Sequence, residues 1–303
     1  MTGAGWVETY RGTVFPWEVD FLDHLTVAYY VERFEHATQG MLAAAGLRPG
    51  TDGHACVTTD AYVRYLRELR AGDIAHMVSG VIASDDAGVV LGHRLVSSDG
   101  GVACGTAEHR LVHVDVGGRG AVPLPADSRR ALDAFRVSWD GPARETRLRP
   151  RTADGFRPTA RDAIRPGEVD VLGGATLTAY VHRFSAAAIQ ALAAFGMTPG
   201  YMRDQRRGLS TFEFQLAVTG RLGAGDVADV RTALVYVGNS SLHLYHRLVD
   251  AGSGAEVATL HQLGVHLDLD ARRPTPFPAA LRGSAQALLV GEPVPGARES
   301  QRA

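Results

Sequence analysis

Four polar side chains lie close together in front of an apolar, helix-forming stretch of the chain. Asp20, Asp23, His24 and Thr26 fall within the passage EVDFLDHLTVAYYVERFEHA, residues 18–37. A carboxylate at the start of a helix can attack a carbonyl carbon or activate water. The free amides and the positive dipole end of the helix can stabilise the oxyanion that then develops. These residue types in this order could therefore act on an activated carbonyl group, with Asp20 as the acid, or Asp20 could satisfy the amides of its own turn.

The chain carries this passage twice. EVDVLGGATLTAYVHRFSAA at 168–187 keeps Asp170 as the counterpart of Asp20, whereas Gly174 stands at the position of His24. The second copy thus retains the acid and lacks the histidine.

The similarity between the two passages extends over most of the chain. Residues 11–50 align on 161–200 without a gap, and eighteen of the forty positions are identical. Three extra residues then change the offset from 150 to 153, so that HRLV at 93–96 aligns on HRLV at 246–249. A register held over such a length indicates a tandem duplication.

Each copy predicts one order of secondary structure. In copy 1 a short strand ending near Val19 precedes a helix from about Thr26 to Ala45, whose apolar residues recur at helical spacing. Thr26 and its counterpart Thr176 are predicted N-caps, with hydroxyls that accept from the first helical amides. Four strand-like segments follow, separated by turn signals: 55–69, 74–84, 88–97 and 102–116. The predicted class is α+β, with an antiparallel sheet wrapped around one long helix in each copy.

The boundaries between these units follow from composition. Unit 1 is expected at 1–120 and unit 2 at 157–280. A connector rich in Pro, Arg and Gly is expected at 121–156 with one short helix, and a C-terminal tail at 281–303, frayed over 291–303.

Composition excludes several classes of function. The net charge of −2 over 303 residues gives no basic surface for nucleic acid. Two cysteines, Cys56 and Cys104, fit a reducing compartment and have no metal-binding spacing. No apolar run is long enough to span a membrane. Residues 1–10 lack a charged region followed by an apolar stretch, so we expect no signal peptide here. The expectation is a cytoplasmic protein without a metal or redox cofactor.

The layout and the passage around Asp20 resemble the hot-dog fold thioesterases of the 4-hydroxybenzoyl-CoA type. That family carries an Asp after the first strand, a Gly-His-(Val/Met)-Asn-like turn, and a Tyr in the first turn of the helix. Asp20, His24 and Tyr30 match these positions. Thr26 stands where Asn is usual, and Asp23 replaces the Gly.

The resemblance implies a fold, an activity and partners. Single-copy members pair because a second subunit completes the sheet and the active site, so the duplication implies a double hot-dog, two units fused as an internal pseudo-dimer with two clefts between them. It implies an acyl-thioesterase acting on an acyl-CoA or acyl-carrier-protein thioester. A homo-oligomer of the pseudo-dimer is compatible with the sequence.

The resemblance and the repeat together give the expected site residues. The expected catalytic residues are Asp20, His24, Thr26 and Asp170. The expected substrate-binding residues are Tyr30, Asp60, Glu213 and Thr176. Asp60 and Glu213 coincide at the offset of 153 on a strand expected at the seam, where each would face the opposite cleft or, alternatively, solvent at an edge.

Several alternatives stay open from the sequence. Asp20 could instead satisfy turn amides, as Asp often does before helices. Glu35, whose counterpart is Ser185, is expected in a surface salt bridge. Because copy 2 lacks the histidine, we expect one main cleft at Asp20; two working clefts are the alternative, since Asp170 is retained. Other functions in view are dehydration or cyclisation of a thioester, and acyl binding without catalysis.

Overall fold

Each copy builds five main strands and one long helix in the computed structural model. It describes residues 5–50, 53–117, 120–147, 149–150 and 154–290. Copy 1 contains β1 (Val7–Thr13), η1 (Pro16–Glu18), α1 (Val27–Ala44), β2 (His54–Tyr65), β3 (Ile74–Ser84), β4 (Gly88–Ser97) and β5 (Ala103–Asp115). Copy 2 contains β6 (Arg157–Ala163), η2 (Pro166–Glu168), α3 (Leu177–Ala193), α4 (Pro199–Asp204), β7 (Arg207–Val218), β8 (Val227–Val237), β9 (Ser241–Asp250), β10 (Glu256–Asp268) and the short β11 (Arg273–Pro274). Two further helices, α2 (Ala126–Asp133) and α5 (Ala279–Gln286), follow the two copies.

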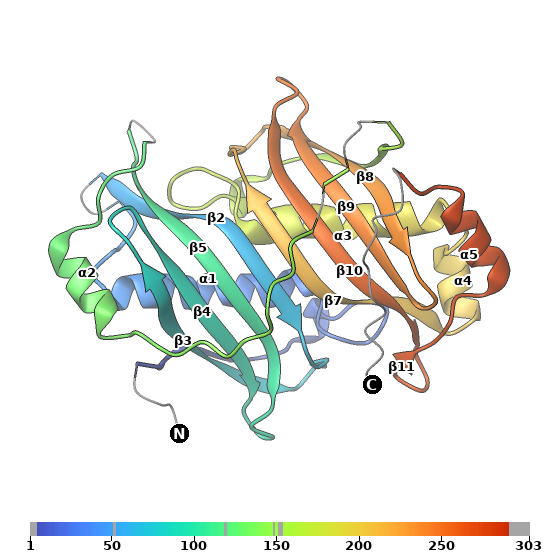
Figure 1. Cartoon of the computed structure of the whole chain (residues 1–303), viewed down its shortest axis with the longest axis horizontal. Coiled ribbons are helices and arrows are strands. Elements are labelled where there is room, and N and C mark those ends of the chain that lie inside the picture. The colour runs from blue at the N-terminus through green and yellow to red at the C-terminus, as the bar shows by residue number, and fades with distance from the viewer. Residues whose placement is uncertain (1–4, 51–52, 118–119, 148, 151–153, 291–303) are drawn as a thin grey trace.

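The strands of both copies join into one antiparallel sheet. Their order is β1-β3-β4-β5-β2-β7-β10-β9-β8-β6, with β11 paired to β10. The two copies meet at β2 and β7, where Ala61 pairs with Leu216 and Arg64 with Glu213. The seam therefore lies at the strand predicted for it, and the sheet is continuous across the duplication (Figure 1).

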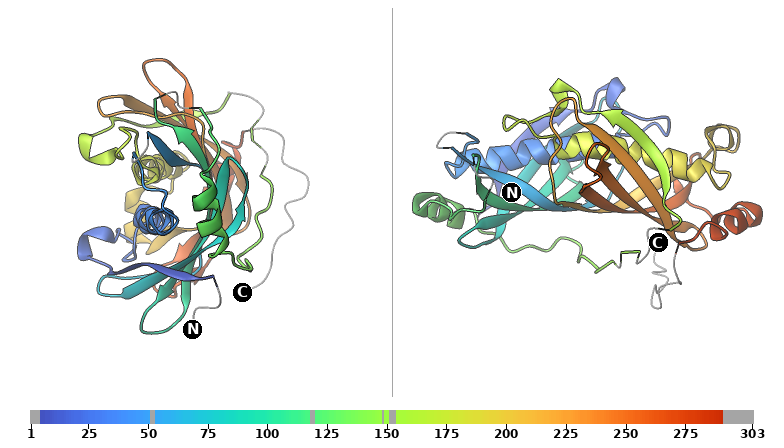
Figure 2. Two further views of the ribbon diagram at one scale, coloured as in Figure 1. Left: turned by 90° about the vertical axis from the view of Figure 1, so that its left-hand side faces the viewer. Right: turned by 90° about the horizontal axis from the view of Figure 1, so that it is seen from above.

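The two long helices lie side by side inside the curve of this sheet (Figure 2). Their apolar stripes form a shared core with the sheet, in which Phe34 and Phe184 are fully buried together with Phe214 of the seam strand. The helices run antiparallel, and Tyr29 packs edge-on against His182 at 5.4 Å. The architecture is the double hot-dog that the repeat predicts.

The entry to each long helix differs in one respect from the sequence prediction. β1 ends at Thr13 rather than near Val19, because Pro16 starts a short 3-10 turn there. The Glu18 carboxylate accepts from the Phe15 amide at 2.7 Å and from the buried Arg33 of α1 at 2.8 Å. Copy 2 repeats the arrangement with Glu168 and Arg183. An ion pair with a buried arginine thus fixes each turn against its own helix.

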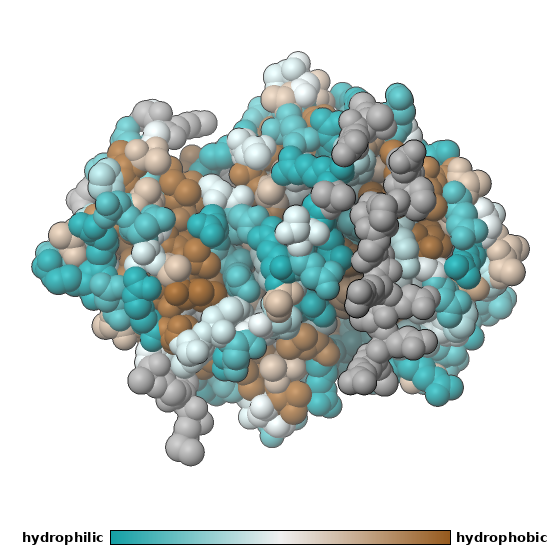
Figure 3. Space-filling model, viewed as in Figure 1, coloured by the Kyte–Doolittle hydropathy of each residue, from teal (hydrophilic) through white to brown (hydrophobic). Residues whose placement is uncertain are grey.

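The connector after α2 crosses the outer, convex face of the sheet (Figure 2). Arg144 binds Asp60 in β2, and Arg147 binds Glu213 in β7 at 3.3 Å. This face is largely hydrophilic, with apolar patches on the first copy (Figure 3). The connector therefore holds both sides of the seam from outside.

The C-terminal helix overlaps the expected tail. α5 spans Ala279–Gln286, and Leu289 forms a bridge with Leu234 of β8. The frayed end expected at 291–303 lies outside the described residues. Within the described residues no helix is both long and apolar enough to cross a membrane. Cys56 and Cys104 are both buried free thiols.

The connector contacts give a prediction on stability. Glu213 is only 2% exposed, and its carboxylate binds Arg147, Arg64 and Gln215. We expect Glu213→Ala to lower the free energy of unfolding by about 2 kcal/mol, because removing one member of a buried ion pair leaves its partners uncompensated.

Denaturant unfolding would measure this loss. Glu8→Ala is the control, since Glu8 forms an exposed ion pair with Arg11 and should cost less than about 0.5 kcal/mol. Equal losses in the two variants would contradict a structural role for Glu213.

Candidate active site

A cavity of about 350 Å³ lies between the two copies, beside the turn that carries Asp20. Copy 1 contributes this turn, the first residues of α1 and the end of β2. Copy 2 contributes α3, α4, β7 and β10. The lining is mainly apolar, with Ile189, Leu192, Met202 and Leu209 on the side of copy 2.

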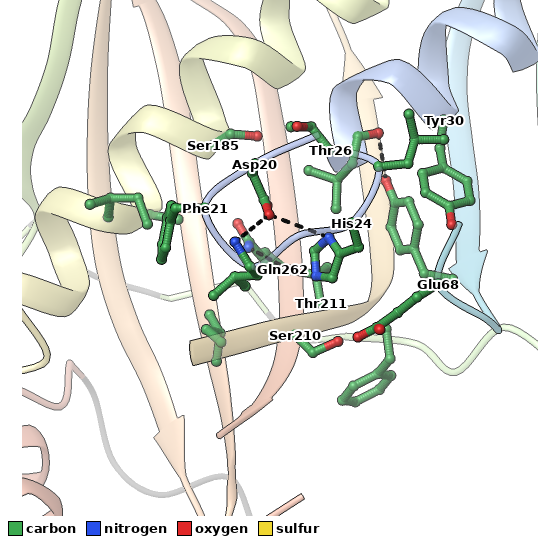
Figure 4. A pocket seen from close by; sticks show the side chains of 18 of the residues that line it. Asp20, Phe21, His24, Thr26, Tyr30, Glu68, Ser185, Ser210, Thr211 and Gln262 are labelled. Carbon is green, nitrogen blue, oxygen red and sulfur yellow. Dashed lines mark hydrogen bonds and ion pairs between the residues drawn. The ribbon is translucent and has the colours of Figure 1, made fainter. Parts of the chain in front are cut away.

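Asp20 and His24 face each other in the wall of this cavity (Figure 4). The turn closes through backbone bonds from Asp20 N to His24 O and from Asp23 N to Asp20 O, both at 3.0 Å. Asp23 takes a positive φ of 61°, the conformation of its counterpart Gly173. Nδ1 of His24 lies 3.5 Å from Oδ1 of Asp20 and has no hydrogen-bond partner among the described residues. The side chain is buried and lines the cavity, so a group bound there could supply the partner that this nitrogen lacks.

Burial raises the pKa of the Asp20 carboxyl above that of an ordinary aspartate. The charge of His24 and the amide of Leu22, which donates to Oδ1 at 2.8 Å, lower this pKa, whereas Glu68 raises it further. The carboxylate is therefore more basic than in water, which suits a group that takes a proton or attacks a carbonyl.

The start of α3 shows how a helix N-terminus here binds an anion. Glu35 of α1 accepts from Leu177 N at 2.8 Å and from Thr178 N at 3.0 Å, and also from the Thr178 hydroxyl. The carboxylate thus occupies the first amides of α3, which have no acceptor within their own helix. The surface salt bridge expected for Glu35 is wrong, because the antiparallel packing of the helices directs it at this terminus.

The start of α1 is different because Ser185 takes the place of Glu35. Its hydroxyl donates to Val181 O at 2.8 Å within its own helix, and the side chain lines the cavity. Val27 and Ala28 are the counterparts of Leu177 and Thr178, and no carboxylate in the described part of copy 2 binds their amides. Their amides form the open, electropositive end of a helix beside Asp20.

The second turn is closed by a charged side chain. Arg221 donates to both oxygens of Asp170 at 2.8 and 2.9 Å. Its guanidinium lies so close to Gly174 that a Cβ there would be 2.1 Å from it. Neither Asp170 nor Thr176 lines the cavity described above. The residue at the Arg221 position in copy 1 is Glu68, which does line it.

Comparison with known proteins identifies the family. The model of the thioesterase-like superfamily matches residues 14–132 and again residues 164–284. The chain belongs to this superfamily. Its two matches coincide with the two copies, so both halves are members.

Curated relatives in this superfamily are similar to the chain over about the length of one copy. The chain is 31% identical over 126 residues to an L-carnitine dehydrogenase/betainyl-CoA thioesterase of Agrobacterium fabrum, covering 41% of the chain and 26% of that protein. It is 26% identical over 130 residues to a betainyl-CoA thioesterase of Pseudomonas aeruginosa, covering 42% of the chain and 82% of that protein. The chain thus spans about a quarter of the length of the first relative.

A solved structure matches over both copies. The 12:0-ACP thioesterase of Umbellularia californica superposes with a TM-score of 0.67 at 15% identity, covering 89% of this chain and 95% of that one. At this identity the match establishes the fold alone, a double hot-dog.

The remaining predicted residues divide between the cavity and the frame. Thr26 and Tyr30 line the cavity, and the Tyr30 hydroxyl donates to Arg67 O at 2.9 Å. The N-cap prediction is correct for Thr176, which accepts from Ala179 N at 3.1 Å. It is wrong for Thr26, whose side chain makes no capping bond.

Asp60 and Glu213 do not face a cleft, and that expectation is wrong. Phe214 and Leu216 of β7 point into the core, so the alternating Glu213 points to the convex face, where Arg147 binds it. Asp60 likewise binds Arg144 of the connector. The two acids hold the connector and lie away from the cavity lining.

Sequence reasoning missed one residue that holds the turn of Asp20 and His24. Arg272 of copy 2 donates to Leu22 O at 2.8 Å and to Glu68 at 3.3 Å. Leu22 also packs with Leu267 and Leu269 of copy 2. No motif marks Arg272 in the sequence, because its partners come from the other copy.

Proposed function

We propose that the chain hydrolyses an acyl-CoA or acyl-carrier-protein thioester at one site, the cavity beside Asp20. The observation that carries the proposal is the carboxylate of Asp20 in a cavity wall that also contains Val27, the first residue of α1. Membership of the thioesterase-like superfamily and the thioesterase names of the relatives support it.

The anion at α3 indicates where the substrate carbonyl lies at α1. Glu35 oxygens accept from Leu177 N and Thr178 N, so a thioester oxygen over α1 would accept from Val27 N and Ala28 N. Hydrogen bonds from these amides strengthen as the oxygen gains negative charge in the transition state. Asp20 then acts on the carbonyl carbon directly or through water, and His24 Nδ1 is placed to bind the same reacting groups.

The cavity lining favours an uncharged acyl group. The side chains of copy 2 that close the cavity include Ile189, Leu192, Met202 and Leu209. Burying an apolar acyl chain against them is more favourable than burying a polar or charged one. The names of these relatives refer to a betainyl group, which carries a permanent positive charge. We expect aliphatic acyl thioesters of moderate length to be better substrates here than betainyl-CoA.

The pH dependence should report the Asp20 carboxylate. Because burial raises its pKa, kcat/KM should fall on acidification at a pH above the ordinary aspartate value of about 3.9. The effect of pH on stability is opposite to its effect on kcat/KM. The raised pKa means that the folded protein disfavours the charged form of Asp20. Wild-type stability relative to Asp20→Asn should be highest below the unfolded pKa and fall as the pH rises through the folded pKa.

Paired pH profiles of kcat/KM and of unfolding free energy would test this. An acid limb at or below the ordinary aspartate range would contradict the assignment of Asp20 as the titrating group.

Thiol release from a panel of acyl-CoA and acyl-carrier-protein thioesters tests the proposed function. Release that disappears in Asp20→Ala supports hydrolysis at this site. Tight binding of the thioesters without release would instead indicate an acyl-binding module.

A further inference from the structure

A chain of buried hydrogen bonds runs across the sheet of each copy towards its long helix. In copy 1 it passes from Ser79 to His93 Nδ1 at 2.7 Å and from His93 Nε2 to the Thr38 hydroxyl at 3.1 Å. Thr38 also binds His109 Nδ1 at 2.9 Å. The hydroxyl of α1 thus completes the network within the core, and Thr38, His93 and His109 are all buried.

Copy 2 has the same chain without the helix hydroxyl. Thr232 binds His246 Nδ1 at 2.8 Å, and His246 Nε2 binds the Gln262 Oε1 atom at 3.1 Å. Gln262 stands at the position of His109. The position of Thr38 is taken by Ala188, which offers no polar atom.

This difference lies in the wall of the cavity. Ala188 and Gln262 both line it, together with Thr211, to which Gln262 Nε2 donates at 2.8 Å. A primary amide nitrogen carries two hydrogens. In the described part of the chain only Thr211 accepts from it, and Gln262 is 4% exposed. A buried donor left without a partner is costly, so a group in the cavity should accept its second hydrogen.

We propose, on the basis of the function above, that the acyl group of the substrate carries a hydroxyl or keto oxygen that accepts a hydrogen bond from Gln262 beside Ala188. This oxygen takes the part that the Thr38 hydroxyl plays in copy 1. Gln262 is then a specificity-determining residue in a cavity lined mainly by apolar side chains.

The helix spacing limits where the oxygen lies along the acyl chain. Ser185 faces the start of α1, where the thioester carbonyl binds, and Ala188 follows three residues later on α3. Three residues of an α-helix rise by about 4.5 Å. The oxygen therefore belongs within a few carbon atoms of the carbonyl, and 3-, 4- and 5-hydroxyhexanoyl-CoA are suitable probes against hexanoyl-CoA.

The experiment compares kcat/KM for these four thioesters in wild type, Gln262→Leu and Ala188→Thr. In wild type at least one hydroxylated ester should exceed hexanoyl-CoA by about tenfold or more, because a site built to bind an oxygen discriminates against its absence. Gln262→Leu should abolish this preference. Ala188→Thr places the protein's own hydroxyl at the site and should lower kcat/KM for the preferred hydroxylated ester.

Thr38→Ala is the matched control, because it removes the corresponding hydroxyl of copy 1 away from the cavity and should leave the preference intact. The preference is the ratio of kcat/KM for the best hydroxylated ester to kcat/KM for hexanoyl-CoA. A ratio of about one in wild type, or a ratio that Gln262→Leu leaves unchanged, overturns the inference and leaves the proposed hydrolysis intact.

If wild type hydrolyses neither these four esters nor any thioester of the wider panel, the proposed function fails, and the dissociation constants of the four esters decide the inference separately. The inference is supported if a hydroxylated ester binds more tightly than hexanoyl-CoA and if Gln262→Leu removes this difference. Equal binding of all four, or no binding, overturns it.

Discussion

Asp20→Asn should lower kcat/KM for thioester hydrolysis by about 10³-fold or more. Asparagine keeps the shape of the side chain and an oxygen that accepts from Leu22 N, so the turn should stay folded. It removes the negative charge that attacks the carbonyl or activates water. Continuous measurement of released thiol, with matched unfolding curves, would separate loss of chemistry from loss of structure.

Asp170→Asn is the matched control for this variant. Its carboxylate is held by Arg221 outside the cavity lining, so we expect near wild-type kcat/KM. A comparable loss in both variants would mean that both clefts work. Full activity in Asp20→Asn would reduce Asp20 to a turn-forming residue and exclude the proposed mechanism.

Ser185→Glu in α3 should lower kcat/KM by about 10²–10³-fold, because the new carboxylate would bind the first amides of α1. Ser185 corresponds to Glu35, so a glutamate there should reach Val27 N and Ala28 N as Glu35 reaches Leu177 N and Thr178 N. The new carboxylate would occupy the position of the substrate oxygen while Asp20 stays intact.

The same variant should be at least as stable as wild type. A carboxylate at a helix N-terminus contributes about 0.3–1 kcal/mol, and more where it is partly buried. Loss of activity together with a higher unfolding midpoint is a signature that ordinary damage to an active site does not produce.

Two further variants control for side-chain size and for the pseudo-symmetry. Ser185→Ala should stay close to wild-type activity. Glu35→Ser should lose about 1 kcal/mol of stability, because the start of α3 loses its cap, and keep its activity. An active Ser185→Glu enzyme would show that the amides of α1 do not bind the reacting oxygen.

The internal repeat explains how much of the fold could be predicted. The offsets of 150 and 153 place α1 on α3 and β2 on β7, and these pairs do form the centre of the molecule. The predicted end of the first strand, near Val19, lies too far along the chain, because Val19 continues an extended pattern although Pro16 and Glu18 form a separate turn.

The asymmetry of the site could be predicted only in part. The missing histidine at Gly174 suggested one main cleft, and the cavity lies beside the copy that keeps His24. The residues that close the other turn, Glu35 and Arg221, differ between the copies in the alignment. Their effect could not be predicted, because it depends on which atoms the packing of two antiparallel helices brings together.

The seam strands show a second limit of sequence patterns. Asp60 and Glu213 match in type and position, which suggested a shared role at a cleft. An alternating strand places them on the outer face, and only the path of the connector reveals that Arg144 and Arg147 meet them there.

Glu35 at the start of α3 has a consequence for how such a protein can evolve. In a homodimer of single-copy subunits, one gene specifies both clefts, so a glutamate that blocked one would block both and eliminate the enzyme. Covalent fusion removes that constraint, since each half mutates independently. One half can then lose turnover in exchange for rigidity, and the other keeps the chemistry.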